Sequence, residues 1–500
     1  MIHVFLSKIF QRYPRKSIRL LEVFPPFISI FLITMPFWGA VFFPAALAYF
    51  IIFFDVYWLY KSINLAICSY IAVHKIKEAE NTDWLQKAKQ EHNFSKVCHV
   101  VVIPAYQEKV EKMKEMIDSI LDQTFPQKRI FVFVAMEQRE EEAPEKAEIL
   151  KKKYQGKFGG TYFTFHPDRE NEVKGKSSNQ AYAAVCANEI LIEQKKLNID
   201  YMTISSVDAD SMFDKQYFSY LTYKFLTSRN RYLSFWQSAN VNYNNFWQVP
   251  TFTRIIAFFG SLWRTSLLVQ GLRLIPNSTY SLSFRLLKEI GYWDTDVIPE
   301  DYRVFFKAFF KMQGKVGVEP IYLRTSMDAP LSPTYFKSLI NKYNQERRWS
   351  WGISDDALYL KWYLTIKDVP IFRKTYILGN VILDHILWPV NWYIITISAN
   401  VIALLNPIFA RTTLGYNLPR LSGFILTLCL FSLFAMIFVD FKLRPRSSFS
   451  KVPKTKQFLF LPEFIFMPVA GFFLSSLPAL ISHIQLIIGK KMDYKVTEKV

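Results

Sequence analysis

The sequence predicts an α/β protein whose doubly wound, mostly parallel sheet is flanked along the chain by transmembrane α-helices. Long apolar tracts occupy the two ends of the chain, at residues 27–73 and 376–488, whereas charged residues are spread throughout 75–373. Within that middle part, apolar runs of strand length alternate with segments of helical spacing, a pattern typical of right-handed β-α-β units. One such run ends at two carboxylates, Asp208 and Asp210, in the position where a parallel sheet ordinarily holds its ligand.

The apolar ends are long enough to cross a membrane. The chain has 500 residues, of which 51% are hydrophobic and 17% aromatic, more than an ordinary soluble protein carries. A helix needs roughly 20 mostly apolar residues to span a bilayer. We therefore predict five spans, at Phe27–Pro44, Leu47–Tyr70, Asp384–Leu405, Ser422–Val439 and Phe464–Leu486. A buried core helix is the alternative for any one span, but five segments near the required length favour a membrane protein. No small-residue cleavage site follows the first run, so we expect the N-terminus to be retained.

The net charge of +19 lies where membrane topology would place it. Basic residues precede the first span and fill the segment before the last one, which is typical of cytoplasmic segments. They are Lys8, Arg12, Arg15, Lys16 and Arg19, followed by Lys442, Arg444, Arg446, Lys451, Lys454 and Lys456. We accordingly predict no nucleic-acid partner. The 4 cysteines and 7 histidines are dispersed, which indicates neither a disulfide framework nor a zinc site.

Three regions follow from this topology. Residues 1–74 are predicted to form a basic N-terminal segment and two transmembrane helices, 75–373 a cytoplasmic domain with interfacial helices near its end, and 374–500 three or so transmembrane helices and a basic tail. The side of the C-terminus stays open, because five spans place it outside while Lys490 and Lys491 argue for the inside. An interfacial or re-entrant segment at 459–468 would reconcile the two.

Strands and helices alternate from the start of the central region. The continuous apolar run at Cys98–Ile103 is typical of a strand buried on both faces, and Val110–Leu121 has apolar residues at helical spacing. A second strand is predicted at Ile130–Met136 and a third at Thr161–Phe165. The acidic stretch between them, Glu137–Glu148, is expected to be a solvated loop and helix.

The two carboxylates at Asp208 and Asp210 follow a fourth predicted strand and suit a hard divalent cation. Mg²⁺ and Mn²⁺ take oxygen ligands and leave coordination positions for phosphate oxygens. The same Asp-x-Asp pattern recurs at Asp294 and Asp296, and a solvated turn is the ordinary explanation for either copy. We prefer the first copy because it follows a buried strand, whereas the second follows a predicted helix end.

The segment from Lys174 to Asn179 resembles the end of a phosphate loop. A Walker motif would need a glycine where Glu170 stands, so that interpretation fails. We predict a flexible basic turn before a helix at Gln180–Leu191, where lysines and helix N–H groups would meet a diphosphate. A merely solvated turn is an equally good local explanation.

Two further stretches combine residue types that carry chemistry. Glu300 and Asp301 follow Pro299 at an expected helix start, where acids ordinarily act as caps. The stretch Gln345–Trp351 holds an amide, two guanidinium groups and two indoles, and its ordinary explanation is an interfacial helix.

Taken together, these motifs resemble those of membrane-embedded family-2-type glycosyltransferases of the cellulose synthase and hyaluronan synthase kind. The resemblance covers residues 100–351, and the motifs occur in the family's order. They are Pro104-Ala105-Tyr106-Gln107-Glu108, the Lys and Asn turn at 174–179, Asp208-x-Asp210, Glu300-Asp301, and Gln345-x-x-Arg348-Trp349. The resemblance implies a nucleotide-sugar transferase fold of the A type.

The resemblance also implies a role for each matching residue. Asp208 and Asp210 would hold the nucleotide and its Mg²⁺ or Mn²⁺, and Asp301 would be the general base. The remaining substrate-binding residues would be Tyr106, Glu108, Glu137, Lys176, Glu300, Gln345, Arg348 and Trp349, with Trp351 as a further aromatic surface. Two departures stand out: Glu137 replaces the Asp that often contacts uracil, which leaves base specificity open, and Pro299 replaces the Thr common before the Glu-Asp pair.

The function implied is an inverting transfer of sugar from a nucleoside diphosphate sugar, with a UDP-sugar favoured, to a saccharide acceptor during polysaccharide synthesis. The location implied is the plasma membrane, of the bacterial inner-membrane type, with the catalytic domain cytoplasmic. A single-sugar transferase acting on a lipid-linked acceptor is the first alternative. A membrane transporter with a cytoplasmic domain is the second, and it would use the polar residues of the spans, Asp55, Lys61, Asp384 and His385. Asp384, Trp388, Asn391 and Trp392 share a helical face, as either a sugar-lined groove or a packing surface would require.

Overall fold

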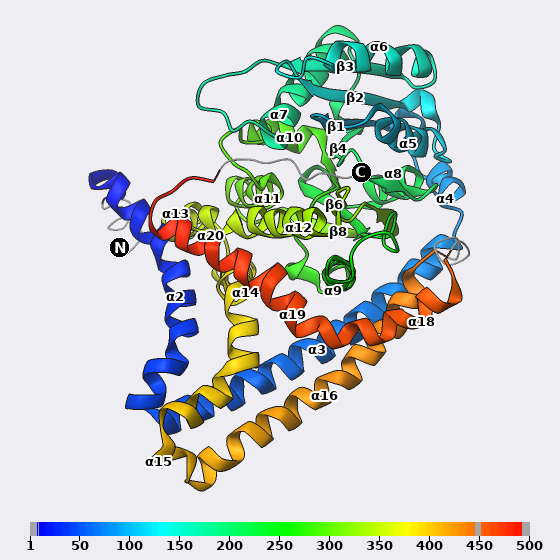
Figure 1. Cartoon of the computed structure of the whole chain (residues 1–500). Coiled ribbons are helices and arrows are strands. Elements are labelled where there is room, and N and C mark those ends of the chain that lie inside the picture. The colour runs from blue at the N-terminus through cyan, green and yellow to red at the C-terminus, as the bar shows by residue number, and fades with distance from the viewer. Residues whose placement is uncertain (1–7, 9, 446–451, 493–500) are drawn as a thin grey trace.

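The computed structural model describes residue 8 and residues 10–445 and 452–492, and its centre is an eight-stranded sheet (Figure 1). The strand order is β3-β2-β1-β4-β7-β6-β8-β5. The strands are β1 Cys98–Ala105, β2 Ile130–Glu137, β3 Gly160–His166, β4 Met202–Ser206, β5 Met212–Phe213, β6 Ser234–Val241, β7 Tyr280–Ser283 and β8 Gly317–Ser326. The predicted strands at 98–103, 130–136 and 161–165 are thus confirmed.

The sheet is mostly parallel, as predicted, with one reversed strand near its middle. Strands β3, β2, β1 and β4 pair in parallel, and so do β6 and β8. Strand β7 is antiparallel to both β4 and β6, and β5 is antiparallel to β8. The reversal was not predicted, because the hydrophobic pattern of a short buried strand is the same in either direction.

Helices cover both faces of the sheet because successive strand residues point to opposite sides. Val100 and Val102 of β1 face α7, α10 and α11, whereas Val101 and Ile103 face α5, α6 and α8. These helices are α5 Val110–Leu121, α6 Ala143–Tyr154, α7 Lys176–Ala187, α8 Tyr217–Thr227, α10 Phe284–Ile290 and α11 Glu300–Lys311. The apolar positions of α5 are buried at the predicted helical spacing, which explains why this helix has the predicted bounds.

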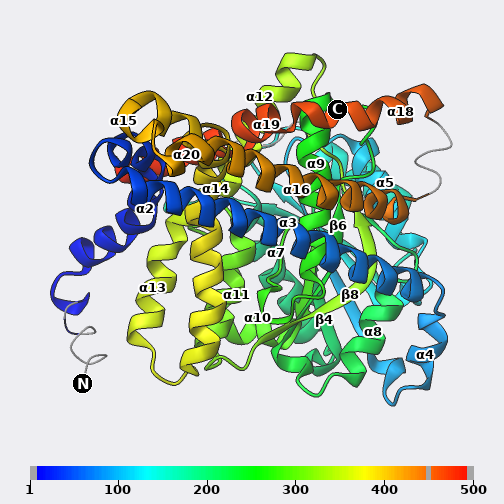
Figure 2. The ribbon, with the colours of Figure 1, turned by 90° about the horizontal axis from the view of Figure 1, so that it is seen from below.

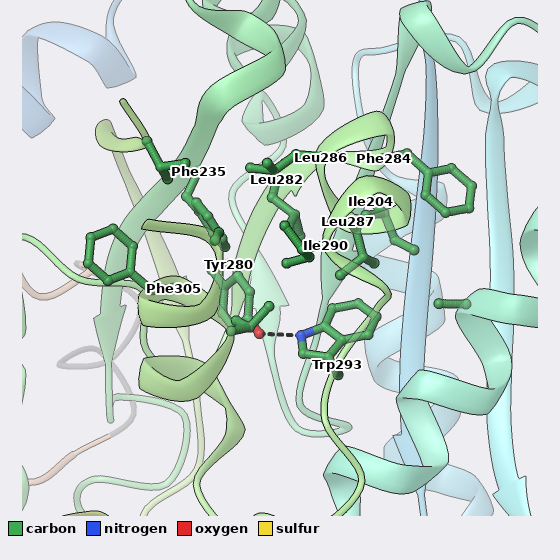
Figure 3. Close-up of a cluster of buried hydrophobic side chains, with 14 of the residues drawn as sticks. Ile204, Phe235, Tyr280, Leu282, Phe284, Leu286, Leu287, Ile290, Trp293 and Phe305 are labelled. Atoms are coloured by element: carbon green, nitrogen blue, oxygen red, sulfur yellow. Dashed lines mark hydrogen bonds between the residues drawn. The ribbon is translucent and has the colours of Figure 1, made fainter. Parts of the chain in front are cut away.

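A dense core lies beneath the middle of the sheet, between β4, β7 and the helices α10 and α11. Leu282 of β7 and Ile204 of β4 are fully buried there, in one cluster with Phe305 of α11 (Figure 3). The indole Nε1 of Trp293 donates a hydrogen bond of 2.7 Å to the hydroxyl of Tyr280, so these two buried polar groups are paired (Figure 3). This core holds the start of β7 in place.

The long apolar helices gather on one side of the sheet domain, as Figures 1 and 2 show. Five segments are long and apolar enough to cross a membrane: α2 Pro14–Phe42, α3 Pro44–Glu80, α14 Ile371–Leu405, α16 Thr413–Leu443, and the segment 454–487, which comprises α18 Lys454–Glu463, α19 Met467–Gly471 and α20 Leu477–Ile487. Helices α3 and α16 lie side by side along much of their length, and each predicted span overlaps one of the five segments. Most of the helices extend beyond the predicted spans, because a helix ends where capping and backbone conformation end it and not where hydrophobicity does.

Shorter helices lie between the sheet and the long apolar helices. They are α4 Trp84–Gln90, α9 Thr251–Leu267, α12 Tyr335–Ser350 and α13 Asp356–Thr365, while α15 Pro407–Ala410 joins α14 to α16. Helix α9 packs against both the long apolar helix α3 and strand β6, and α12 packs against α20. The sheet domain is therefore in direct contact with the long apolar helices.

One of the basic residues that we interpreted as part of the cytoplasmic charge takes part in a buried ion pair. Arg444 is buried, its Nη2 lies 2.5 Å from Oδ2 of Asp440, and Asp440 also accepts a 2.7 Å hydrogen bond from Tyr243. The ring of Phe246 lies 3.4 Å below the guanidinium carbon. Arg444 thus ties the end of α16 to the segment after β6. The predicted loop residues Arg446 and Lys451 lie outside the described residues.

Candidate active site

The residues singled out in the sequence meet around one cavity of about 330 Å³. Tyr106 follows β1, Glu137 ends β2, and Asp208 follows β4, so the cavity lies at the carboxyl ends of these parallel strands. The helices α7, α11 and α12 complete its wall. All the predicted site residues line it: Tyr106, Glu108, Glu137, Lys176, Asp208, Asp210, Glu300, Asp301, Gln345, Arg348 and Trp349.

A buried lysine sits at the centre of the cavity's polar wall. Nζ of Lys176 lies 2.8 Å from Oδ1 of Asp208 and 2.9 Å from Oε1 of Glu300, and it donates a 2.7 Å hydrogen bond to the carbonyl of Ser278. Burial alone would lower the pKa of Lys176, but Asp208 and Glu300 together raise it well above its ordinary value. Lys176 therefore carries a positive charge that neutralises two carboxylates from different elements.

Lys176 is also the first residue of α7, which corrects the prediction of a flexible turn over 174–179. The helix begins four residues earlier than the predicted start at Gln180. Asn179 donates a 2.7 Å hydrogen bond from Nδ2 to the carbonyl of Ala135 in β2, and the hydroxyl of Ser178 bonds to the carbonyl of Val173 at 2.7 Å. These bonds fix the first turn, so its N–H groups and Lys176 are presented to the cavity by an ordered helix N-terminus.

Asp301 faces the cavity from the first turn of α11. Its Oδ2 accepts a 3.0 Å hydrogen bond from the backbone N–H of Ser278, and it lies beside Glu300. Burial raises the pKa of Asp301 to about 6, and repulsion from Glu300 adds to the rise, while Ser278 and Lys176 oppose it. A carboxylate with this pKa is suited to accept a proton near neutral pH.

Ser278 bonds to both Asp208 and Asp301, and the sequence analysis did not identify this residue. Its hydroxyl donates to Oδ2 of Asp208, while its N–H bonds to Asp301 and its carbonyl to Lys176. Its backbone has φ of +56°, a left-handed conformation that is uncommon for a residue other than glycine. The polar run Asn277-Ser278-Thr279 before β7 was the only local signal, and it matches no motif.

Asp208 and Asp210 fit a divalent cation if other ligands complete the set. Oδ2 of Asp210 accepts a 2.7 Å hydrogen bond from the backbone N–H of Asp328, which directs the side chain, and the side chain of Asp208 is 26% exposed. Within the described residues, no three His, Cys, Asp or Glu side chains gather closely enough to hold a metal alone. Two hard carboxylates are consistent with Mg²⁺ or Mn²⁺ that also binds phosphate oxygens.

The second Asp-x-Asp copy has a structural role. Asp294 lies 2.6 Å from Nζ of Lys307 and 3.4 Å from Nη1 of Arg303, so it anchors the loop to α11. The side chain of Asp296 is 67% exposed. Neither residue is among those described as lining the cavity.

Helix α12 brings an amide, a guanidinium group and an indole to the cavity. Gln345 and Trp349 lie one turn apart, and Lys342 contacts both: its Nζ is 2.9 Å from Oε1 of Gln345 and 4.7 Å from the centre of the Trp349 ring. Trp351 does not join them. It is buried against Ile298 in a small apolar cluster, so its expected role as a sugar-facing surface is wrong.

Tyr106 lines the cavity, and its ring is in contact with the guanidinium group of Arg139, which lies outside the cavity lining. The Arg139 guanidinium lies 3.9 Å from the centre of the Tyr106 ring, and its Nε donates a 2.5 Å hydrogen bond to Oε2 of Glu137. Glu137 therefore neutralises Arg139, a residue that no sequence motif indicated. A planar ring and a planar cation in contact offer a stacking surface of the kind that binds a nucleobase.

A family model described as glycosyl transferase family group 2 matches residues 203–439, just under half of the chain. The match supports a family-2-type glycosyltransferase. It contains Asp208, Asp210, Asp301 and the Gln345–Trp349 motif, but it begins after β1, β2 and β3. It does not show the finer resemblance to cellulose and hyaluronan synthases. A search of curated proteins found no match.

Two solved glycosyltransferase structures match this chain at low similarity. The mannosyltransferase PcManGT from Pyrobaculum calidifontis, in complex with GDP-Man and Mn²⁺, is 13% identical, covers 84% of this chain and 99% of its own, and has a TM-score of 0.43. S. aureus TarS 1-349 in complex with UDP is 12% identical, covers 80% of this chain and 94% of its own, and has a TM-score of 0.39. At these TM-scores we transfer no residue role or ligand to this chain.

We predict that replacing Lys176 with Met will destabilise the protein far more than the same change at Lys174. Lys176→Met leaves the carboxylates of Asp208 and Glu300 close together without a counter-charge, a loss that should cost roughly 3 kcal/mol, the lower end for buried pairs, because the Asp208 side chain is 26% exposed. Lys174 is 53% exposed and pairs with Asp168 at the surface, so its loss should cost less than about 1 kcal/mol. Thermal melting of the purified variants in detergent measures both. Equal melting temperatures would show that the cluster does not hold these elements together.

Proposed function

We propose that this protein is a membrane-bound, inverting glycosyltransferase. It transfers a sugar from a nucleoside diphosphate sugar, with a UDP-sugar favoured, to a saccharide acceptor in the synthesis of a polysaccharide. Residues 75–373 form its cytoplasmic catalytic domain, and the flanking helices hold it in a plasma membrane of the bacterial inner-membrane type. The observation that carries the proposal is the arrangement of Asp301, Lys176 and the two aspartates Asp208 and Asp210 around one cavity.

Asp301 is the proposed general base. An acceptor hydroxyl attacks the anomeric carbon of the sugar from one face while the nucleoside diphosphate departs from the other, so the configuration inverts. The hydroxyl must lose its proton as the new bond forms, and Asp301 accepts it at a carboxylate oxygen. The neighbouring Glu300 is less suited to this role because Lys176 lies 2.9 Å away and compensates its charge.

The leaving diphosphate is stabilised on the α7 side of the cavity. The N-terminus of α7 presents positive charge there, and Arg348 on α12 lines the same cavity. Asp208 and Asp210 would hold Mg²⁺ or Mn²⁺, which when bound neutralises charge developing on the diphosphate. Tyr106, held against the Arg139 guanidinium, offers a ring to the nucleobase, and Trp349 offers an aromatic face to the acceptor sugar.

The extent of the cavity favours an acceptor of more than one sugar. Beyond Asp301 it continues along the membrane helix α14, where Asn380, Asp384 and Trp388 line it. The predicted sugar-lined groove does not reach Trp392, which is not among the described residues that line the cavity. Trp392 packs directly against Gly471, where a Cβ would lie 2.1 Å from the indole. A single-sugar transferase on a lipid-linked acceptor uses the same chemistry and remains the alternative.

Polar contacts within the spans weigh against a transporter. Asp55 accepts a 2.6 Å hydrogen bond from Ser422, and Asp384 pairs with Arg273 at 2.8 Å and with Lys61 at 3.4 Å. These residues are engaged by neighbouring helices and loops of the same chain, which accounts for their presence in apolar segments.

The function is tested by incubating the purified protein in detergent or vesicles with a panel of nucleoside diphosphate sugars. We expect release of the diphosphate from at least one donor and sugar transfer that Asp301→Asn reduces at least about 10²-fold, because the amide cannot accept the proton. Nucleotide binding should persist in this variant, since the substitution keeps the shape of the side chain. Undiminished transfer by Asp301→Asn would refute the base assignment.

Transfer should also depend on pH through Asp301. Because burial and Glu300 raise the pKa of Asp301 to about 6, the group is a base above this pH and protonated below it. We expect kcat/KM to rise with pH through about 6 and to level off above it, falling to about one tenth of the plateau at pH 5. A profile that stays flat down to pH 4.5 would contradict this role for Asp301.

Metal dependence separates the two Asp-x-Asp copies. Chelation should abolish turnover, and Mg²⁺ or Mn²⁺ should restore it. Asp210→Asn keeps an oxygen for the Asp328 N–H but removes the charge, so it should weaken both metal and nucleotide binding. The exposed Asp296 provides the control, because Asp296→Asn should change neither. Calorimetric titration of nucleotide with and without metal measures these effects, and similar losses in both variants would mean that the charge at Asp210 holds no metal.

A further inference from the structure

A histidine on helix α14 lines the same cavity, and of its two ring nitrogens only Nδ1 has a hydrogen-bond partner among the described residues. Nδ1 of His385 lies 2.9 and 3.0 Å from the two carboxylate oxygens of Asp356. The His385 side chain is only 9% exposed, and it lines the cavity together with Gly352 and Trp388. Within the described part of the chain, Nε2 of His385 has no hydrogen-bond partner.

The place of His385 connects it to the reacting end of the cavity. Its ring lies 6.3 Å from that of Tyr302, nearly parallel to it, and Tyr302 follows Asp301 in α11. Nε2 lies against Gly352, where a Cβ would be 3.6 Å from it. Gly352 follows the Gln345–Trp349 motif by one short turn. His385 therefore stands between the proposed base and the part of the cavity that continues along α14.

Asp356 fixes the orientation of the ring. Its carboxylate is fully buried at the start of α13, and it accepts the Nδ1–H of His385. With Nδ1 protonated, Nε2 is either a lone-pair acceptor or, in the imidazolium form, a donor. A hydroxyl group can bond to Nε2 in both forms because it donates and accepts, whereas an anionic oxygen suits only one.

The charges around His385 also favour an uncharged ligand. Asp384 is paired with Arg273 and Lys61, and Asp355 is paired with Arg303 at 2.6 Å. Arg273, Lys61 and Arg303 thus already have carboxylate partners. The positive end of the α7 dipole, by contrast, lies at the proposed diphosphate end of the cavity. Trp388 adds an indole to the wall, and aromatic faces suit the C–H faces of a sugar ring.

We propose that His385, oriented by Asp356, is a positioning residue for the acceptor: its Nε2 hydrogen-bonds a hydroxyl of an acceptor saccharide that extends from Asp301 toward Trp388. The proposal rests on the glycosyltransferase function and names the acceptor end of that site. It implies that α14 contributes to acceptor recognition as well as to membrane anchoring.

A purely structural role is the competing explanation, in which the pair only joins α13 to α14. The chain offers a matched control for it. His99 of β1 is fully buried and, like His385, is held through its ring nitrogens, here by Thr203 and Thr222, but it is not among the described residues that line the cavity. A structural effect should appear in stability for both histidines, whereas an effect on acceptor affinity should appear only for His385.

The experiment uses the full-length protein in detergent, a donor that it cleaves, and fluorescently labelled cellobiose, chitobiose and mannobiose as acceptors. KM is measured separately for donor and disaccharide, together with the melting temperature, in the native protein and in His385→Ala, His385→Gln, Asp356→Asn and His99→Gln. We expect His385→Ala to raise the acceptor KM about tenfold, with the donor KM changed less than about twofold. His385→Gln, whose amide reaches the position of Nε2, should recover part of the loss, and Asp356→Asn should raise the acceptor KM as well.

Each other outcome decides against a defined part of the proposal. An unchanged acceptor KM in His385→Ala and Asp356→Asn, or an equal rise in His99→Gln, would leave His385 with a structural role. Donor cleavage by native protein without transfer to any of the three disaccharides would overturn the saccharide assignment while leaving the nucleotide-sugar chemistry intact. Failure of the native protein to bind or cleave any nucleotide sugar would instead refute the proposed function.

Discussion

The candidate site depends on one buried cation held between two carboxylates. Lys176 at the start of α7 joins Asp208, after β4, to Glu300, at the start of α11. A buried charge is stable only when it is paired and hydrogen-bonded, so the three elements must meet with little freedom. Because Glu300 precedes Asp301 directly, the same contact sets the position and the electrostatic surroundings of the proposed base.

The reversed strand β7 completes this arrangement. A parallel strand between β4 and β6 would bring its amino end to the opposite edge of the sheet, whereas the antiparallel β7 starts at the edge where the cavity lies. Ser278, two residues before the start of β7, can therefore bond Asp208, Asp301 and Lys176 at once. The buried Tyr280–Trp293 pair below it gives this loop a rigid base.

The cavity also shows that the catalytic and membrane parts of the protein are not independent. Helix α9 contributes Arg264 and α14 contributes Asn380, Asp384 and Trp388 to the same wall as the aspartates. Arg264 is fixed by a 2.8 Å hydrogen bond from its Nε to the carbonyl of Asn240 in β6, so even the distant wall is tied to the sheet. An acceptor entering along α14 would meet the base without leaving the protein.

The sequence by itself determined the features that depend on local pattern. The buried strands, the amphipathic helix at Val110–Leu121, the five apolar segments and the choice of Asp208 over Asp294 all follow from periodicity and from the residues that flank each motif. Only the tertiary structure decided strand direction and long-range pairing. The antiparallel β7, the role of Ser278, the stacking of Arg139 on Tyr106 and the facing of His385 with Asp356 join residues that are distant in sequence or carry no local signal. Side-chain pairing of this kind depends on how the strands are ordered and how the helices pack, and a periodic pattern contains neither.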